Sequence, residues 1–431
     1  MYDAVIIGSG PAGYAAAIRL GQRKKKVALI EKDKIGGECL NYGCIPSKAL
    51  IELASSINYL REMPGMDINY SIDVKKWQEW KWSMINKLTG GVEILCKSYG
   101  VDVVRGTGYI IDKNHVKVGD ALYETENLVI ATGSVPVKLK GIEDVLYNRE
   151  ILDFDHVPKS LVIIGGGYIG VELGTAFRKL GSEVTIIEMM PSILPGVDPE
   201  LVRYTERRMR QLGITIMTGK KVKSARKDGQ FTVVLESGET IIADIVLMTV
   251  GRIPNTEGYG LENLNLEMDG RFIKTDERKR TSIKGVYAIG DVSGQPMLAH
   301  KGYYDADIAA DNICGIDSVV DYKAMPYVIY SDPEISYTGS KSYKSTRFPV
   351  PANGRSLTMN AGNGTFNVYY DEKGIITGAG FAAPHSSELI SEISVAVESG
   401  LMAMDIGLTI HPHPTVSEGV KESAEEAYGK P

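Results

Sequence analysis

One strand-turn-helix-strand pattern occurs twice in this chain and restricts the possible folds more than any other feature. Residues 5–13 and 161–170 each contain a short apolar run followed by three glycines in the spacing Gly-x-Gly-x-x-Gly. Each copy continues through a helix-like stretch into a second apolar run that ends in an acid, Glu31 or Glu188, 18 residues after the third glycine. The repeat predicts two β-α-β units and therefore an α/β fold with parallel sheets.

The three glycines of each copy indicate a site for the pyrophosphate of a dinucleotide. The first glycine permits a tight turn, the second lets backbone N–H groups approach the phosphates, and the third allows close packing of helix and strand. The N-terminus of the following helix supplies positive potential. One such turn is a weak indication, because many glycine-rich turns bind nothing, but two complete copies favour two sites.

The acid at the end of each copy predicts the type of nucleotide. Glu31 and Glu188 should each accept hydrogen bonds from an adenosine ribose, and a carboxylate at this place would repel a 2′-phosphate. Met189 and Met190 follow Glu188, where an NADP site would carry arginine. The second site is therefore predicted to bind NAD rather than NADP.

Only two of the four cysteines, Cys39 and Cys44, lie close together in the sequence. A regular helix would separate residues five apart by about 7.5 Å along its axis, whereas a disulfide needs Cα atoms roughly 4.4–6.8 Å apart. If the two cysteines join, the helix between them must be distorted, which Gly43 and Pro46 permit or impose. The alternatives are two free thiols or half of a metal site.

The composition narrows the class of protein. At 431 residues, with 43% hydrophobic and 24% charged residues, the chain predicts a globular protein of two to four domains. The net charge of −6 argues against a nucleic-acid surface. No apolar run reaches the roughly 18 residues of a membrane span, and strand-like residues begin directly after Met1. We therefore expect no signal peptide and a cytoplasmic location.

A helical stretch between the two copies carries three clustered tryptophans. Its apolar positions fall on one helical face, and core packing is the expected reason. Gly90 and Gly91 are expected to interrupt this helix. The apolar positions are Trp77, Trp80, Met84, Leu88 and Leu95.

Residues 36–48, Gly-Gly-Glu-Cys-Leu-Asn-Tyr-Gly-Cys-Ile-Pro-Ser-Lys, resemble the redox segment of the flavoprotein disulfide reductases, especially those of the dihydrolipoamide dehydrogenase type. The resemblance extends over nearly the whole chain. It includes the segments 131–134, 250–255, 288–291 and 297–300. It implies two Rossmann-like dinucleotide-binding domains, for FAD and NAD, and a C-terminal α+β interface domain that forms a homodimer. We place the FAD domain at residues 1–145 and 270–322, the NAD domain at 146–269 and the interface domain at 323–431.

The resemblance also assigns roles to single residues. Cys39 and Cys44 would form the redox disulfide, Lys48 would pair with Glu172 near the flavin, and Asp291 would bind the ribityl chain. The FAD site would comprise Gly8, Gly10, Gly13, Glu31, Lys48, Thr132, Gly133, Asp291, Leu298, Ala299 and His300. The NAD site would comprise Gly165, Gly167, Gly170, Glu188 and Gly251. No metal is implied.

Residues 411–418 are similar to the family's His-x-His-Pro-Thr-x-Ser-Glu segment. Thiolate, not thiol, attacks a disulfide, so the reaction needs a base and a carboxylate to orient it. The resemblance assigns these roles to His413 and Glu418, with a cis His413-Pro414 bond, and leaves His411 structural.

The resemblance implies oxidation of dihydrolipoamide with NAD⁺ as acceptor, through FAD and the Cys39-Cys44 disulfide. The partner would be a lipoyl-bearing domain of a 2-oxo acid dehydrogenase or glycine-cleavage complex. The alternatives are an NADH-dependent reductase of another low-molecular-weight or protein disulfide, and a flavin-binding subunit of a larger complex. Two departures from the family pattern bear on the site. Glu38 replaces a threonine and adds a charge beside Cys39, and the segment after Gly339 is short.

Overall fold

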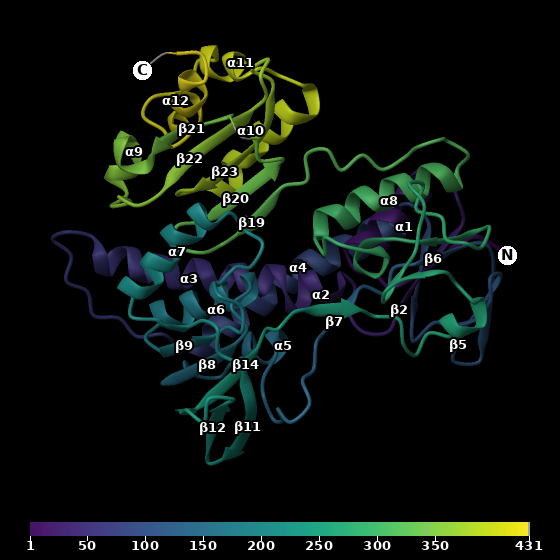
Figure 1. Ribbon diagram of the computed structural model, residues 1–431. Helices are drawn as coiled ribbons and strands as arrows, with labels where there is room; N and C mark the ends of the chain where they lie inside the picture. Colours follow the sequence, from purple (N-terminus) through teal and green to yellow (C-terminus); the bar gives the residue numbers. More distant parts are fainter. Residues whose placement is uncertain (343, 430–431) are drawn as a thin grey trace. The chain divides into compact units, whose positions relative to one another are not determined.

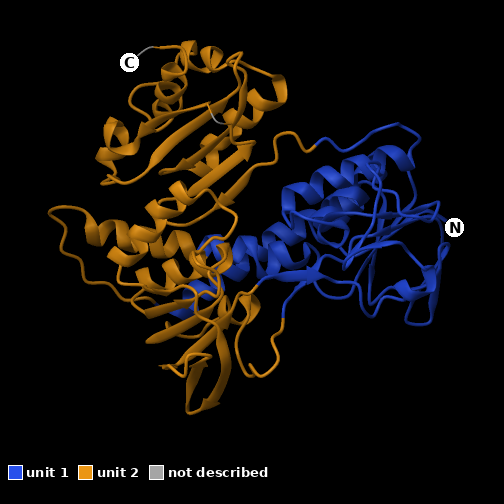
Figure 2. Cartoon of the chain, in the orientation of Figure 1, with its two compact units in different colours: residues 1–49, 73–137, 251–321 blue, residues 50–72, 138–250, 322–431 orange. Residues whose placement is uncertain are grey.

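The computed structural model describes residues 1–342 and 344–429, so Tyr343, Lys430 and Pro431 of the predicted interface domain lie outside the described residues. The chain divides into two compact units (Figure 2). Unit 1 comprises residues 1–49, 73–137 and 251–321, and unit 2 comprises residues 50–72, 138–250 and 322–431. Among the described residues, no helix combines the length and the apolar character that a membrane span requires.

Unit 1 is built on a sheet whose parallel strands have the order β3-β2-β1-β6-β18. Buried Val, Ile, Leu and Ala residues occupy the central strands β1 and β2 and the end of β6, as expected where both faces of a parallel sheet are covered. Strands β4 and β5 extend the sheet in antiparallel fashion beyond β6. The strands are β1 (Tyr2–Ile7), β2 (Val27–Glu31), β3 (Val101–Arg105), β4 (Tyr109–Asp112), β5 (His115–Val118), β6 (Ala121–Ile130) and β18 (Val286–Ala288).

Two helices, α1 (Pro11–Gln22) and α8 (Ala299–Ile313), pack together in unit 1 (Figure 1). Small buried residues line their contact, among them Ala16 and Ala17 of α1 and Ala306 of α8. These side chains let the helices approach closely, so the first glycine turn lies beside the start of α8.

The prediction for the tryptophan-rich helix was wrong in two respects. Helix α4 (Val74–Ser98) continues without a break through both glycines. Its buried residues are Lys81, Ile85 and Cys96, whereas Trp80 on the predicted face is 53% exposed. Two glycines cost the helix only about 2 kcal/mol relative to alanines, which a helix of this length tolerates.

The first part of unit 2 repeats the same topology. Its parallel sheet has the order β10-β9-β8-β14, and helix α6 (Tyr168–Lys179) follows β8. A separate three-stranded antiparallel sheet, β11-β12-β13, precedes β14 in the chain. The strands are β8 (Ser160–Ile164), β9 (Glu183–Ile187), β10 (Thr215–Met217), β11 (Val222–Asp228), β12 (Gln230–Leu235), β13 (Thr240–Ala243) and β14 (Ile245–Met248).

The C-terminal part of unit 2 is an antiparallel sheet of order β19-β20-β23-β22-β21, with helices packed against it. Its strands are β19 (Tyr327–Ile329), β20 (Ile335–Gly339), β21 (Lys344–Pro349), β22 (Thr365–Tyr370) and β23 (Ile376–Ala382). The helices include α10 (Ser386–Ser399), α11 (Ala403–Leu408) and α12 (Glu418–Glu426). The predicted fold class, two Rossmann-like regions with a C-terminal α+β region, is confirmed.

Candidate redox and dinucleotide sites

The first glycine turn leaves open space at the N-terminus of α1. Gly8 has a φ of +99°, and a Cβ atom on Gly13 would lie 1.8 Å from the Gly8 carbonyl oxygen, so only glycine permits this close packing. Gly10 caps the helix, and a Cβ there would meet no atom within 4 Å. This open approach to the helix N-terminus fits a pyrophosphate.

Glu31 is held by the same turn. The carboxylate is 8% exposed, and it accepts hydrogen bonds from the Ser9 backbone N–H at 2.9 Å and hydroxyl at 2.7 Å and from the Asp33 backbone N–H at 2.8 Å. A carboxylate offers about four acceptor positions. Glu31 is therefore fixed in position and retains capacity for a ribose hydroxyl.

The second turn repeats this geometry in unit 2. Gly165 has a φ of +108°, a Cβ on Gly170 would lie 2.2 Å from the Gly165 oxygen, and Gly167 faces open space. Glu188 accepts hydrogen bonds from the Gly166 N–H at 2.6 Å and the Met190 N–H at 2.7 Å. The residues thus fit a second dinucleotide, which supports the prediction of NAD.

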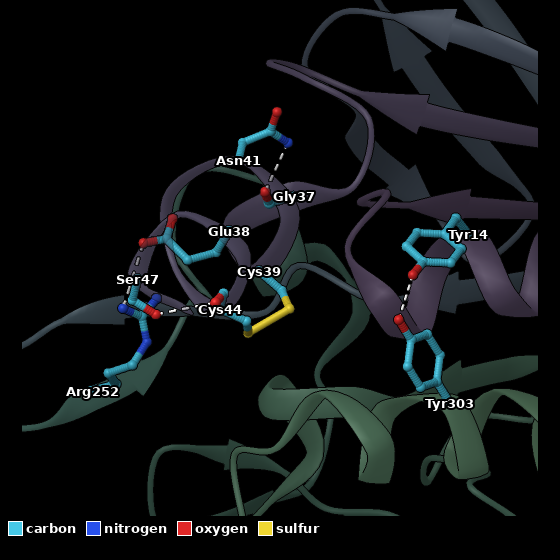
Figure 3. Close-up of a disulfide and its surroundings, with 9 residues drawn as sticks. All are labelled: Tyr14, Gly37, Glu38, Cys39, Asn41, Cys44, Ser47, Arg252 and Tyr303. Atoms are coloured by element: carbon cyan, nitrogen blue, oxygen red, sulfur yellow. Dashed lines mark hydrogen bonds and ion pairs between the residues drawn. A yellow bond between two sulfur atoms is a disulfide. The ribbon is translucent and has the colours of Figure 1, made fainter. Parts of the chain in front are cut away.

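The redox segment is a helix broken between the two cysteines, which are joined by the disulfide drawn in Figure 3. Helix α2 (Gly37–Tyr42) ends before Gly43, whose φ of −129° and ψ of −100° are not helical, and α3 (Cys44–Glu62) begins directly after it. Cys39 and Cys44 form a disulfide with their Cα atoms 4.7 Å apart. The predicted distortion of the helix is confirmed, and the alternatives of free thiols and a half metal site are excluded.

The redox segment packs directly against the first glycine turn. The Gly36 N–H donates to the Ser9 carbonyl oxygen at 2.9 Å, and a Cβ on Gly37 would lie 2.7 Å from the Gly10 Cα. Cys44 is exposed and Cys39 is partly buried. The disulfide is therefore placed next to the site that would hold FAD, within one unit.

Other residues predicted for the FAD site lie in the same unit. Asp291, in the short helix Gly290–Ser293, accepts a hydrogen bond from the Ser134 hydroxyl at 2.6 Å. Thr132 donates through its hydroxyl to the Asn255 carbonyl oxygen at 2.7 Å, and Gly133 has a φ of +75°. Leu298 caps α8, which begins with Ala299 and His300, and Lys48 lies in α3 one turn after Cys44. Their roles toward FAD stay predictions.

A buried ion cluster supports this region and was not predicted. Asp305 is fully buried, and its carboxylate accepts from the Gly290 N–H at 3.0 Å and from Lys301 Nζ at 2.8 Å. Lys279 Nζ lies 3.2 Å from the other oxygen, and burial lowers the pKa of Lys279 despite the attraction of Asp305. The only sequence signal was the four-residue spacing of Lys301 and Asp305.

The predicted acid–base pair is formed in the C-terminal region. His413 Nδ1 lies 2.8 Å from Glu418 Oε1, and Glu418 Oε2 accepts the Thr415 N–H at 2.9 Å. That backbone N–H, and then His413, lower the pKa of Glu418. The His413 ring is 83% exposed, and the His413-Pro414 bond is cis, as predicted.

His411 differs from His413 because both of its ring nitrogens are engaged, by the Thr409 carbonyl oxygen and by Glu392. This arrangement fits its predicted structural role. Glu172, in α6, is buried and accepts the Tyr330 N–H at 2.9 Å, and its pairing with Lys48 remains a prediction. Gly251, predicted for the NAD site, has a φ of +114° and precedes β15 (Arg252–Pro254).

The other two cysteines do not take part in this site. Cys96 is fully buried, and burial raises its pKa to about 11. Cys314 is only partly buried and caps the C-terminal end of α8. Within the described part of the chain, no group of three or more His, Cys, Asp or Glu side chains could hold a metal ion.

Comparisons with known proteins agree with this geometry. A family model described as pyridine nucleotide-disulphide oxidoreductase matches residues 2–306, and the dimerisation domain of that family matches residues 325–424. The dihydrolipoyl dehydrogenases of Geobacillus stearothermophilus and Bacillus subtilis are 42% and 43% identical to this chain, over 100% of this chain and 97% of each relative.

Two solved structures are similar to this chain over nearly its whole length. LpdA from Mycobacterium tuberculosis matches with a TM-score of 0.92 and 26% identity, covering 99% of both chains. The HOCl-induced flavoprotein disulfide reductase RclA from Escherichia coli matches with a TM-score of 0.89 and 26% identity, covering 98% of this chain and 99% of that one.

Proposed function

The chain belongs to the pyridine nucleotide-disulphide oxidoreductase family, and we propose that it oxidises dihydrolipoamide to lipoamide with NAD⁺ as the electron acceptor. One observation carries this proposal: a disulfide closes across a broken helix that packs on the first glycine turn. The high identity to dihydrolipoyl dehydrogenases over the full length supports the choice of dithiol.

The protein's own residues account for the dithiol chemistry. His413 accepts the proton of one thiol of dihydrolipoamide, and Glu418 orients the ring and stabilises its charged form. The resulting thiolate attacks Cys39 Sγ, which breaks the Cys39-Cys44 bond and releases Cys44 as a thiolate. The second thiol of the substrate then passes its proton to Cys39 as it displaces that sulfur from the mixed disulfide, so lipoamide leaves and two electrons remain on the cysteine pair.

The remaining electron transfer depends on the two dinucleotide sites. FAD, when bound, supplies two-electron transfer between the cysteine pair and NAD⁺. Glu31 and Glu188 would hold the two adenosine riboses, and the open helix N-termini beside Gly10 and Gly167 would face the pyrophosphates. Asp291 and Lys48 would complete the flavin site.

A turnover assay tests the substrate. Dihydrolipoamide with NAD⁺ should give kcat/KM at least about 100-fold above that of glutathione disulfide with NADPH or NADH. A faster reaction with another low-molecular-weight or protein disulfide would favour the reductase alternative. Flavin binding without turnover of any dithiol or disulfide would favour a flavin-binding subunit.

We further propose that the active site is shared between the subunits of a homodimer, since His413 lies in the region that matches the dimerisation domain. Mixing Cys39→Ser and His413→Gln homodimers tests this arrangement. Reassortment of equal amounts makes about half of the dimers mixed, each with one intact site, so roughly a quarter of full activity should return. Confirmed reassortment without recovered activity would place His413 in its own chain's site.

The proposed reaction suggests partners and a compartment. Lipoamide is carried on a protein arm, so the partner would be a lipoyl-bearing domain of a 2-oxo acid dehydrogenase or glycine-cleavage complex. The cytoplasm is the proposed location, because a reducible cysteine pair and two unpaired cysteines suit a reducing compartment.

A further inference from the structure

The charge that Glu38 adds beside Cys39 has a specific partner in unit 1. The Arg252 guanidinium, in β15, places its Nη1 atom 3.7 Å from Glu38 Oε1. Their side chains are only 12% and 27% exposed, so water screens the pair less than it screens a surface ion pair. Figure 3 shows the two side chains directed toward each other beside the disulfide.

The same guanidinium also holds Ser134. Arg252 Nε donates to the Ser134 hydroxyl and Nη2 donates to the Ser134 carbonyl oxygen, both at 2.8 Å. Because the hydroxyl oxygen accepts from Arg252, its single proton is free to donate to Asp291 Oδ2 at 2.6 Å. The planar guanidinium therefore fixes a donor that points at Asp291.

These contacts form one chain of interactions from the redox disulfide to the flavin site. The chain runs from Glu38, next to Cys39, through Arg252 and Ser134 to Asp291. Glu38 and Arg252 carry opposite charges, so together they add little net charge at the redox pair. Either charge alone would change how readily a thiolate forms at Cys39.

We propose that Arg252 is a positioning residue with two separable roles: it balances the Glu38 charge beside Cys39, and it orients Ser134 toward Asp291 for FAD binding. This inference rests on the proposed function for the identity of Cys39 as the attacked sulfur and for the place of Asp291 in the flavin site. Its test uses no dithiol substrate, so its failure is distinguishable from a failure of the proposed function.

The first measurement is alkylation of Cys39 in the reduced, FAD-saturated enzyme as a function of pH, followed by peptide mass spectrometry. Arg252→Met should raise the midpoint of alkylation by about one pH unit, and Glu38→Gln should lower it by a similar amount. The double variant should return to the wild-type midpoint. Shifts in the same direction, or no shift, would overturn the charge-balancing role.

The second measurement is the affinity of the apoprotein for FAD. Arg252→Met should weaken FAD binding roughly tenfold, because Ser134 loses the two hydrogen bonds that Arg252 donates to it. The double variant should bind FAD as weakly as Arg252→Met. Glu38→Gln should leave the affinity within about twofold, since the Ser134 contacts persist. Unchanged FAD affinity in Arg252→Met would overturn the orienting role.

Two control variants distinguish the specific effects of Arg252 from a general folding defect. Arg252→Lys keeps the charge but not the planar fork, so it should keep the wild-type midpoint and still weaken FAD binding several-fold. Arg278→Met removes an arginine of the same unit that pairs with Asp317 at the surface, and it should change neither measurement. An effect of Arg278→Met equal to that of Arg252→Met would mean that neither role belongs to Arg252.

Discussion

The two dinucleotide-binding regions share one backbone arrangement and differ in the loop that crosses each glycine turn. In unit 1, the Gly36 N–H donates to the Ser9 carbonyl oxygen at 2.9 Å, and in unit 2 the Leu194 N–H donates to the equivalent Gly166 oxygen at 2.8 Å. The turns, the capping glycines and the buried acids otherwise match closely.

The two regions differ in the segment of chain that follows the residue donating this hydrogen bond. After Gly36 the chain enters α2 and reaches both cysteines, whereas after Leu194 it passes through Pro195 and Gly196 into α7 (Pro199–Gln211) without a cysteine. The β-α-β unit therefore provides the nucleotide site in both regions. The loop that hydrogen-bonds to the glycine turn determines whether a redox group lies beside that site.

The largest effect is expected from removing the redox group of the first region alone. Cys44→Ser should lower dihydrolipoamide turnover by roughly 10³-fold or more. It should also abolish the long-wavelength absorbance that we expect from charge transfer between the Cys44 thiolate and oxidised flavin after anaerobic reduction by NADH. The FAD content and the affinity for NADH should not change, because neither glycine turn is altered. A persistent charge-transfer band in the variant would contradict the role of Cys44.

The next largest effect is expected from replacing the second glycine of each turn, Gly10 or Gly167, by valine. A Cβ atom at Gly10 or Gly167 would meet no atom of the protein within 4 Å, and the extended backbone there suits valine. The valine side chain would instead occupy the approach of a pyrophosphate. Gly10→Val should yield protein without flavin. Gly167→Val should retain flavin and raise the KM for NAD⁺ by about 10- to 100-fold.

Absorbance at 450 nm and steady-state kinetics measure these two outcomes, and thermal unfolding of both variants checks the fold. If Gly10→Val kept its flavin and Gly167→Val lost it, the assignment of the two regions would be reversed.

A smaller effect is expected at the acid of the second region. Glu188→Gln combined with Met189→Arg removes the carboxylate and adds a cation at a side chain that is 65% exposed. The preference for NAD⁺ over NADP⁺, measured as the ratio of kcat/KM values, should fall by about 10-fold or more. Equal use of both nucleotides by the unaltered enzyme would refute the prediction of NAD.

The smallest effect on turnover is expected at Cys96, the buried thiol of the first region. Cys96→Ser should leave kcat within about twofold, because the side chain lies in the core between α1 and α4 rather than at the redox loop. Its pKa of about 11 keeps this thiol protonated in the folded protein at pH 8, where unfolded thiols begin to ionise.

The raised pKa of Cys96 also determines how the stability of the protein changes with pH. Folding raises the pKa of Cys96, so its contribution to stability is complete below the unfolded value and decreases as the pH rises toward 11. Iodoacetamide at pH 8 should therefore modify Cys96 only after unfolding, and rapid modification in the native enzyme would contradict its burial.

Much of the fold and of the site could be predicted, because the sequence patterns that indicate them each lie within a short stretch of the chain. Glycine spacing sets the backbone of each turn, and the intervals to Glu31 and Glu188 follow from one helix and one strand. The distortion that a Cys39-Cys44 bond would require followed from the reach of a disulfide, and the structure places it at Gly43. The error at Gly90 and Gly91 arose because local helix propensity is weak compared with the packing of a long helix.

The sequence by itself determined the two β-α-β units, because each depends on residues close together in the chain. The redox pair and the His413-Glu418 dyad came from the resemblance of two short segments to those of a known family. Tertiary structure alone decided that Arg252 meets Glu38 and Ser134, and that Lys279 joins Asp305. These contacts join strands, helices and loops that are far apart in the sequence. Which side chains meet there depends on how the elements pack, and no spacing or periodicity encodes it.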